Sequence, residues 1–350
     1  MIGVAARFFR VRTYCLMVVA VAIACACMAD ASAHRTTRKA AHRHAVVHRK
    51  PARRHAVTHA RTRHHRPSRH AQRPKKHARR HHPAHRRHAA PRLVLRARCG
   101  RPALMRNLHS QSAYVLDVRT GRALLARNAH TVRPIASISK LMTAIVARGA
   151  RRPLGGILRV TASDRDRIKF TGSRLLVGSR LSRRDMYHIA LMSSENRAAS
   201  ALSRDYPGGQ PAFVAAMNRK ARALHMYHTH FREPTGLSPH NVSTAVDLSH
   251  LVAAAARDPL IRRFSTDKSY VARPGHGQLL YVNSDPVIRF DHWPVLLQKT
   301  GFINEAGHGL VMRVLVAGRP ETIVLLGAPT RSAMVLDAIR VHRWLACSLT

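Results

Sequence analysis

The stretch from His34 to Arg92 contains no Asp or Glu, and this absence decides how much of the chain can fold. The stretch holds 20 Lys or Arg and 14 His, interleaved with Ala and Pro and with few large apolar residues. Such a segment cannot bury enough apolar surface to offset its conformational entropy, and its like charges repel one another. We therefore predict that residues 34–92 are disordered and that one folded domain spans residues 93–350.

The amino-terminal 33 residues have the layout of a secretory signal peptide. Basic residues up to Arg12 precede an apolar run from Tyr14 to Ala29, and residues 31–33 are small. This layout predicts a cleaved signal over residues 1–33 and a periplasmic or cell-envelope location. An uncleaved membrane anchor is the alternative, although the run falls short of the roughly 20 apolar residues that span a bilayer.

Two of the five cysteines, Cys99 and Cys347, remain once the signal peptide is removed, and they lie near the two ends of the predicted domain. Chain termini of a compact domain often lie close together, and a secreted protein meets an oxidising environment. A Cys99–Cys347 disulfide is therefore expected, with two unpaired thiols as the alternative.

The formal net charge of +45 at pH 7 raises the question of a nucleic-acid partner. A basic arm neutralises phosphates without reading a base sequence, but a secreted chain meets peptide carboxylates and anionic lipids instead. We therefore expect no nucleic-acid partner, and predict that residues 34–92 hold the protein near an anionic wall or membrane surface. A solvated spacer and a metal-binding role for the histidines stay open as alternatives.

Beyond Leu93, segments with strand-like and helix-like apolar spacing alternate. A short turn around Gly121 separates two apolar runs and predicts a hairpin. Ser182 is a candidate N-cap for the predicted helix that begins at this residue. The order predicts an α/β (α+β) domain, in which helices flank a sheet and a helical lobe lies between the early and late strands. The predicted strands are 112–118, 123–126, 279–282, 295–299, 310–316 and 322–326, and the predicted helices are 137–148, 182–193, 197–203, 211–224, 244–257 and 332–345.

Ser137 and Lys140 stand three residues apart at the start of a predicted helix, which places both side chains on one face. A serine alcohol becomes nucleophilic when a base takes its proton. A lysine serves as that base when burial or nearby cations keep it neutral for part of the time. The amino terminus of the helix adds positive potential where an oxyanion forms. On its own this spacing is weak evidence, because Ser and Lys three apart recur by chance.

Two further short motifs add polar groups. Ser194 and Asn196 lie at a predicted helix break, where both can face one cleft, although serine and asparagine are also ordinary helix caps. The run Lys299-Thr300-Gly301 ends a predicted strand, where a cation and a hydroxyl can bind a substrate carboxylate. The glycine lets a substrate backbone approach closely, and the next amide, that of Phe302, can face an oxyanion.

The three motifs occur in the order Ser-x-x-Lys, Ser-x-Asn, Lys-Thr-Gly, and this combination is specific. With them, the chain resembles the penicillin-binding protein and serine β-lactamase superfamily, and most closely the low-molecular-mass D-alanyl-D-alanine carboxypeptidases and endopeptidases (peptidase S11). The resemblance implies a DD-peptidase/serine β-lactamase-like fold, with an antiparallel sheet flanked by helices plus a helical lobe. The likeness runs from about Gln111 to Leu345 and includes residues 112–117, 135–144, 171–175, 233–238, 241 and 243–245. Similarity to the endopeptidase branch lies in residues 233–238, 241 and 243–245, and in the short stretch after Lys299.

This resemblance implies a serine-type D-alanyl-D-alanine endopeptidase or carboxypeptidase that acts on peptidoglycan through an acyl-enzyme. Ser137 would be the nucleophile, Lys140 its base and Ser194 the proton relay to the leaving amine. The substrate would be positioned by Asn196, Lys299, Thr300 and Gly301, and the amides of Ser137 and Phe302 would form the oxyanion hole. The resemblance implies no metal or organic cofactor, and it makes β-lactams covalent inhibitors at Ser137.

Two other functions remain as alternatives. A class A β-lactamase needs a glutamate that activates the deacylating water, and the candidate here is Glu233, which we interpret as structural because of its Glu-Pro-Thr-Gly context. A secreted protein that binds polyanions or metals without catalysis is the second alternative. His308 follows Lys299 between two glycines and is interpreted as a surface turn residue, while Tyr187 and His188 are interpreted as helix residues.

Overall fold

The computed structural model describes residues 99–275, 277–290 and 293–349. The predicted signal peptide, residues 1–33, and the predicted basic segment, residues 34–92, lie outside the described residues. No helix within the described part of the chain is long and apolar enough to cross a membrane.

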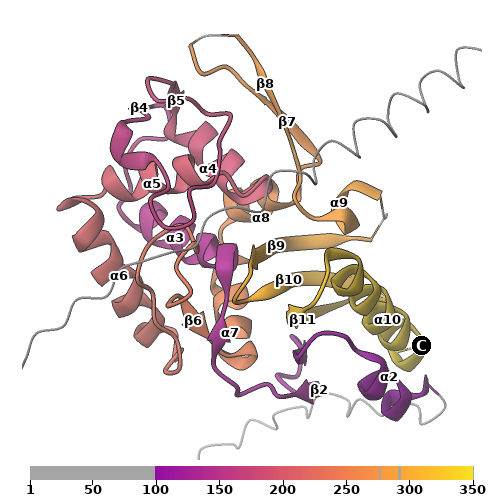
Figure 1. Ribbon diagram of the computed structural model, residues 1–350. Helices are drawn as coiled ribbons and strands as arrows, with labels where there is room; N and C mark the ends of the chain where they lie inside the picture. Colours follow the sequence, from indigo (N-terminus) through magenta and orange to yellow (C-terminus); the bar gives the residue numbers. More distant parts are fainter. Residues whose placement is uncertain (1–98, 276, 291–292, 350) are drawn as a thin grey trace, which may run out of the picture. The chain divides into compact units, whose positions relative to one another are not determined.

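A five-stranded antiparallel sheet forms the centre of the domain, in the order β2-β1-β11-β10-β9 (Figure 1). The strands are β1 (Ser112–Asp117), β2 (Ala123–Arg127), β9 (Val295–Ile303), β10 (Gly307–Val316) and β11 (Arg319–Ala328). The predicted hairpin is present as β1 and β2. Strand β1 also pairs with β11 from the other end of the domain, so the two ends of the folded chain share one sheet.

Alternate residues of the central strands enter two different cores, as the two-residue period of a strand requires. On one face, Leu310 and Met312 pack with the helices α2 (Arg101–Asn107) and α10 (Arg331–Leu349). On the other face, Val311 packs into the core of the helical lobe. Because both faces are covered, the late strands consist of nearly continuous apolar runs.

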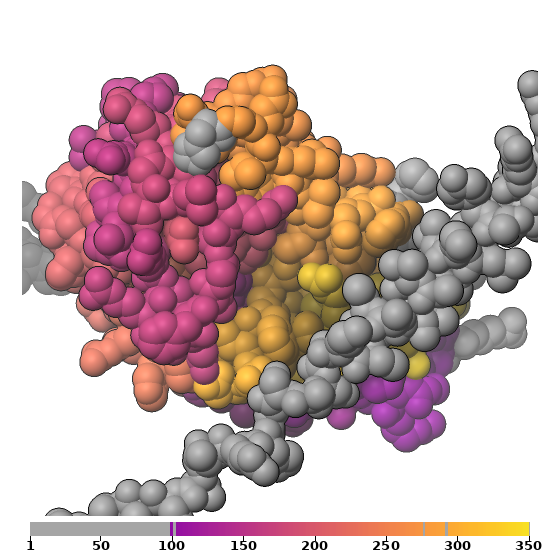
Figure 2. Space-filling model, turned by 45° about the horizontal axis from the view of Figure 1, so that its top comes forward, coloured from indigo at the N-terminus to yellow at the C-terminus, as the bar shows by residue number. Residues whose placement is uncertain are grey.

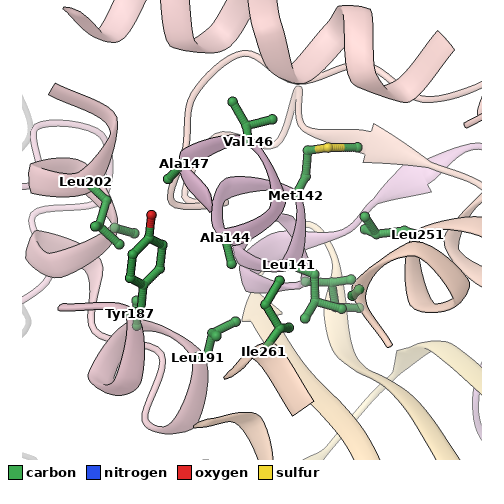
Figure 3. Close-up of a cluster of buried hydrophobic side chains, with 14 of the residues drawn as sticks. Leu141, Met142, Ala144, Val146, Ala147, Tyr187, Leu191, Leu202, Leu251 and Ile261 are labelled. Atoms are coloured by element: carbon green, nitrogen blue, oxygen red, sulfur yellow. The ribbon is translucent and has the colours of Figure 1, made fainter. Parts of the chain in front are cut away.

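The helical lobe lies against the second face of the sheet, and the helix α3 (Ser139–Gly149) runs through its middle (Figure 3). The helices around it are α4 (Arg183–Met192), α5 (Asn196–Arg204), α6 (Gly209–Ala223), α7 (Ala245–Ala255) and α8 (Pro259–Thr266). Leu141 and Met142 of α3 are fully buried, together with Ile261 of α8 and Leu251 of α7. This packing makes α3 a fixed platform for the residues at its amino end.

The predicted N-cap of α4 is confirmed, because the Ser182 hydroxyl accepts a hydrogen bond from the Asp185 amide at 3.1 Å. The predicted strand 279–282 exists as β8 (Leu279–Val282) but lies outside the main sheet, where it pairs with β7 (Ser269–Ala272). The remaining short elements are β3 (Arg133–Pro134) with β6 (Val242–Ser243), β4 (Ile157–Arg159) with β5 (Arg180–Ser182), α9 (Pro286–Phe290), and the single turns η2 (Ala136–Ile138) and η3 (Ala162–Asp164).

Cys99 and Cys347 form a disulfide, with their Cα atoms 5.8 Å apart. The bond joins the start of α2 to the end of α10, two helices that also pack against each other. The disulfide predicted from the sequence is therefore confirmed, and it ties together the two ends of the described domain.

Candidate active site

Ser137 sits in a tight turn and not in a regular helix. The sequence predicted one helix over 137–148, but η2 (Ala136–Ile138) comes first and α3 starts at Ser139. Ala136 adopts a left-handed φ of 47°. Two glycines lie directly against this turn. A Cβ atom added at Gly236 would lie 2.0 Å from the Ala136 carbonyl oxygen, and a Cβ atom added at Gly301 would lie 2.8 Å from the Ile135 carbonyl oxygen. Both positions therefore require glycine.

Lys140 lies one turn after Ser137, and its side chain is fully buried. Its Nζ donates a hydrogen bond to the Ser137 hydroxyl oxygen at 2.8 Å and another to Asn196 Oδ1 at 2.7 Å. A third hydrogen bond, of 2.5 Å, runs to the backbone carbonyl oxygen of Thr235. These three acceptors hold the amine beside the serine oxygen, which is the geometry that proton transfer between them needs.

Burial lowers the pKa of Lys140 to about 8, because a charged amine loses its hydration inside the protein. The carboxylates of Glu233 and Glu195 act in the opposite direction and limit the drop. At neutral pH a useful fraction of this amine is therefore neutral and able to accept the serine proton.

Ser194 and Asn196 stand at the break between α4 and α5, as predicted. Ser194 has a left-handed φ of 66°, a strained conformation for a residue with a side chain and one that is frequent at functional sites. The side chain of Asn196 bridges two groups, since Oδ1 accepts from Lys140 and Nδ2 donates to the Thr171 hydroxyl at 3.3 Å.

A cavity of about 320 Å³ opens above the serine. In the space-filling view, a furrow runs between the magenta surface of the helical lobe and the orange and yellow surface of the late strands (Figure 2). Residues from all three motifs line this cavity: Ser137, Ser194, Asn196, Thr300 and Gly301, together with Phe302. The three predicted motifs are thus brought together in space.

Lys299 is fully buried and is not among the residues that line this cavity, whereas Thr300 and Gly301 are. The predicted strand ended at Lys299, but β9 continues to Ile303, so the motif lies in mid-strand. Lys299 Nζ donates to the Thr300 carbonyl oxygen at 2.9 Å. Burial and the nearby Lys140 lower the pKa of Lys299 well below its usual value, and Asp285 opposes them.

His308 does not lie in a surface turn, as the sequence analysis expected. It belongs to β10, pairs directly with Phe302 of β9 and lines the cavity. The two rings are stacked, with their centroids 4.2 Å apart. Burial and the nearby Arg331 lower the pKa of His308, so its ring is mostly neutral at neutral pH.

Glu233 holds the loop that supplies the Thr235 carbonyl group. Its carboxylate accepts hydrogen bonds of 2.6 Å from the amides of Thr235 and Gly236, and another of 2.6 Å from the Thr235 hydroxyl. Asn241 Nδ2 also donates to Glu233, at 3.2 Å. This agrees with the structural interpretation of Glu233. The role of Thr235 was missed, because a backbone acceptor leaves no side-chain pattern in a sequence.

The family model for D-alanyl-D-alanine carboxypeptidases, peptidase S11, matches residues 100–330. The chain therefore belongs to this family of serine peptidases. The membership confirms the family and the class of hydrolase that the three motifs predicted. Within the described residues, His, Cys, Asp and Glu form no group of three that could hold a metal ion.

Curated relatives from several bacteria are named D-alanyl-D-alanine endopeptidase. The one from Pseudomonas aeruginosa is 48% identical over 216 residues, which are 61% of this chain and 70% of the relative. The one from Escherichia coli is 43% identical over 259 residues, or 73% of this chain and 83% of the relative. These relatives place the chain in the endopeptidase branch of the family, as predicted.

The fold is similar to that of the Streptomyces K15 DD-transpeptidase, with a TM-score of 0.64 at 23% sequence identity. The match covers 68% of this chain and 97% of the transpeptidase. The predicted fold class, an antiparallel sheet flanked by helices with a helical lobe, is confirmed.

Proposed function

We propose that the protein is a serine-type DD-endopeptidase that hydrolyses D-alanyl cross-links in peptidoglycan through an acyl-enzyme on Ser137. The observation that carries this proposal is the 2.8 Å hydrogen bond between the Ser137 hydroxyl and Lys140, whose burial lowers its pKa to about 8. A serine beside a partly neutral amine can attack a peptide carbonyl group, and no cofactor is required.

In the proposed first half-reaction, Ser137 Oγ bonds to the D-alanyl carbonyl carbon and its proton moves to Lys140 Nζ. The amides of Ser137 and Phe302 stabilise the oxyanion that forms. The C–N bond then breaks, and the leaving amine takes up the proton through Ser194. In the second half-reaction, water adds to the ester carbon, and Ser137 leaves with its proton restored.

Strand β9 is an edge of the described sheet, so one side of it has no neighbouring strand there. An extended peptide can pair with such an edge through backbone hydrogen bonds. This mode of binding would draw the substrate along Thr300 and Gly301 and past Ser137, which lies beside them in the cavity.

The shape of the cleft supports cleavage of cross-links over trimming of a terminal residue. The cavity above Ser137 adjoins a second cavity of about 190 Å³ at Asn196 and Leu237. It adjoins a third, of about 630 Å³, at Ser193, Ser284 and Arg331. A cross-link has a long peptide on both sides of the scissile bond, for which adjoining cavities give room, whereas the leaving side of a carboxypeptidase substrate is a single D-alanine.

The proposed location is the periplasm or cell envelope. The Cys99–Cys347 disulfide supports it, because such bonds persist in oxidising compartments. The substrate proposed for the enzyme is found in the same place.

Mass spectrometry of the purified protein after incubation with a penicillin tests the acylating serine. We expect an adduct of one penicillin on the parent and none on Ser137→Ala. A correctly folded parent that forms no adduct would overturn the proposal. Digestion of purified cross-linked peptide dimers then separates the two peptidase activities, because an endopeptidase releases monomers and a carboxypeptidase removes terminal alanine.

A further inference from the structure

Residues 283–285, between β8 and α9, are joined to strand β9 by side-chain hydrogen bonds. Gln298 Nε2 donates to Asn283 Oδ1 at 2.8 Å. The hydroxyl oxygens of Ser284 and Thr300 lie 2.7 Å apart and share a hydrogen bond. The segment therefore helps to fix the part of β9 that lines the cavity above the serine.

Asp285, the last residue of this segment, is fully buried, and a helix cap accounts for only one of its two carboxylate oxygens. Oδ1 accepts a hydrogen bond from the Val287 amide at 2.9 Å, at the start of α9. An asparagine caps a helix equally well. Oδ2 has no hydrogen-bond partner among the described residues. Because a buried carboxylate oxygen without a partner is costly, the negative charge at this position needs a further explanation.

Lys299 is the buried cation that can use such a charge. Its Nζ donates to the Thr300 carbonyl oxygen at 2.9 Å, and that acceptor is neutral. Burial and Lys140 lower the pKa of Lys299, and the Asp285 carboxylate opposes this drop. Burial raises the pKa of Asp285 to about 6, and Lys299 in turn opposes this rise. The two side chains therefore interact through their charges, and such interactions extend beyond hydrogen-bond distance in a protein interior.

We propose that Asp285 is a positioning residue of the active site, and that its buried carboxylate keeps Lys299 cationic next to Thr300 and Gly301. This role rests on the proposed acyl-enzyme function. With Asp285 ionised, Lys299 keeps its proton and supplies positive potential to the part of β9 that binds the substrate. Without this carboxylate, Lys299 is a buried amine with a neutral acceptor, and it gives up its proton more readily.

Other charged groups surround this pair, and they behave alike in parent and variant. Arg289 of α9 and Arg331 of α10 also act on Asp285, and both keep their charge throughout the range of the test. Lys140 of α3 acts on Lys299 and titrates in both proteins. His308 of β10 has a lowered pKa, so its ring is neutral in the alkaline range. A difference between the pH profiles of variant and parent therefore reports on the pair.

Asp285→Asn removes the charge and keeps an oxygen that can cap α9. The measurement is the rate constant for acylation by penicillin, from pH 5 to pH 10. The parent should level off above pH 8. The variant should pass through a maximum and then fall about tenfold per pH unit, because Lys299 loses its proton at a lower pH. Below about pH 6 the two profiles should converge, since Asp285 is then protonated in the parent as well.

Asp258→Asn is the matched control. Asp258 also caps a helix, α8, and accepts from the Leu260 amide at 2.8 Å, but it is not among the groups that shift the pKa of Lys299. It should keep the profile of the parent. In a Lys299→Gln background, Asp285→Asn should change the rate by less than about twofold, because its effect acts through Lys299.

Asp285→Ser gives a second version of the test, because serine also caps helices and carries no charge. It should show the same alkaline fall as Asp285→Asn. If either variant folds and keeps the profile of the parent, Asp285 is a helix cap alone and the proposal is wrong. A folded parent that penicillin does not acylate would instead overturn the acyl-enzyme function.

Discussion

Lys140 Nζ lies 2.8 Å from the hydroxyl oxygen of Ser137, at the end of a side chain that is fully buried. The amine is thus shielded from water, whereas Ser137 is half-buried and faces the cavity, and burial brings the pKa of the amine down to about 8. Both facts bear on how the reaction should depend on pH.

The rate of acylation by penicillin should rise with pH. Only the neutral amine can take the serine proton, and below its pKa of about 8 the neutral fraction falls about tenfold per pH unit. We expect the second-order rate constant to climb from pH 6 to pH 8 and then level off, as measured by stopped-flow acylation. Glu195→Gln removes a carboxylate that raises this pKa, so its profile should shift to lower pH. A flat profile for the parent would exclude Lys140 as the base.

Replacing Gly236 by alanine should impair acylation much more than folding. The added Cβ would lie 2.0 Å from the Ala136 carbonyl oxygen and 2.7 Å from the Ser137 amide nitrogen, so the turn must move. A displacement of about 1 Å at a nucleophile costs roughly 100-fold in rate. We expect a loss of at least that size in penicillin acylation, with a native circular dichroism spectrum.

Gly318→Ala is the control for this variant. Gly318 has a similar left-handed φ, 72° against 85° at Gly236, but an added Cβ there meets nothing within 4 Å. It should lower the melting temperature through backbone strain alone and leave acylation unchanged. Equal acylation by both variants would mean that the contact with the Ser137 turn is unimportant.

Glu321→Gln should stabilise the protein at alkaline pH. Glu321 is fully buried opposite Asp117 in the sheet, and burial together with this carboxylate raises its pKa to about 8. The folded state therefore keeps a proton that the unfolded chain releases above its ordinary pKa of 4.5. Stability contributed by this group is present at pH 4 and is lost as the pH rises to 8. We expect Glu321→Gln to gain roughly 1–3 kcal/mol at pH 8 and little at pH 4, by denaturant unfolding.

Glu305→Gln is the control for pH-dependent stability, because Glu305 pairs with Lys169 and its pKa is lowered. It should not share the gain at pH 8. A Glu321→Gln variant with the stability of the parent at every pH would show that this carboxyl group is not held protonated.

Deletion of residues 34–92 should release the enzyme from its surroundings without changing its chemistry. An attraction between a polycation and anionic surfaces is screened by salt, so it weakens sharply between about 50 mM and 500 mM. The full chain should sediment with isolated cell walls at the lower salt concentration and stay in solution at the higher one. The deletion variant should stay in solution at both, with the same rate of penicillin acylation. Sedimentation of the deletion variant at low salt would assign wall binding to the folded domain.

Local chemistry made much of the fold predictable. Ser182 predicted the start of α4, because a serine hydroxyl caps a helix by accepting a hydrogen bond from an amide only a few residues further along the chain. The early hairpin and the long late strands followed from apolar spacing. The two-residue strands β3 and β6 had no such signal, since a period cannot be read from two residues. Strand β8 was predicted, but its partner β7 was not, so the pairing of β8 outside the main sheet was missed.

The sequence predicted the site residues whose side chains form motifs. It did not predict the features of the site that depend on the backbone or on tertiary packing. The break in the helix at Ser137 comes from contacts with Gly236 and Gly301, which lie about 100 residues or more away in the sequence. The place of His308 in the cavity depends on the length of β10, which begins three residues earlier than the predicted strand. The Glu-Pro-Thr-Gly run was visible, but its use as a backbone acceptor for Lys140 needed coordinates.

The bond between Cys99 and Cys347 makes the described domain a covalent ring. A single backbone cut inside a ring leaves both pieces attached, so nicked protein should migrate as one species until a reductant is added. The ring also offers an engineering route. New termini can be opened at the exposed turn between β10 and β11, at Ala317 and Gly318, while the original ends stay joined through sulfur.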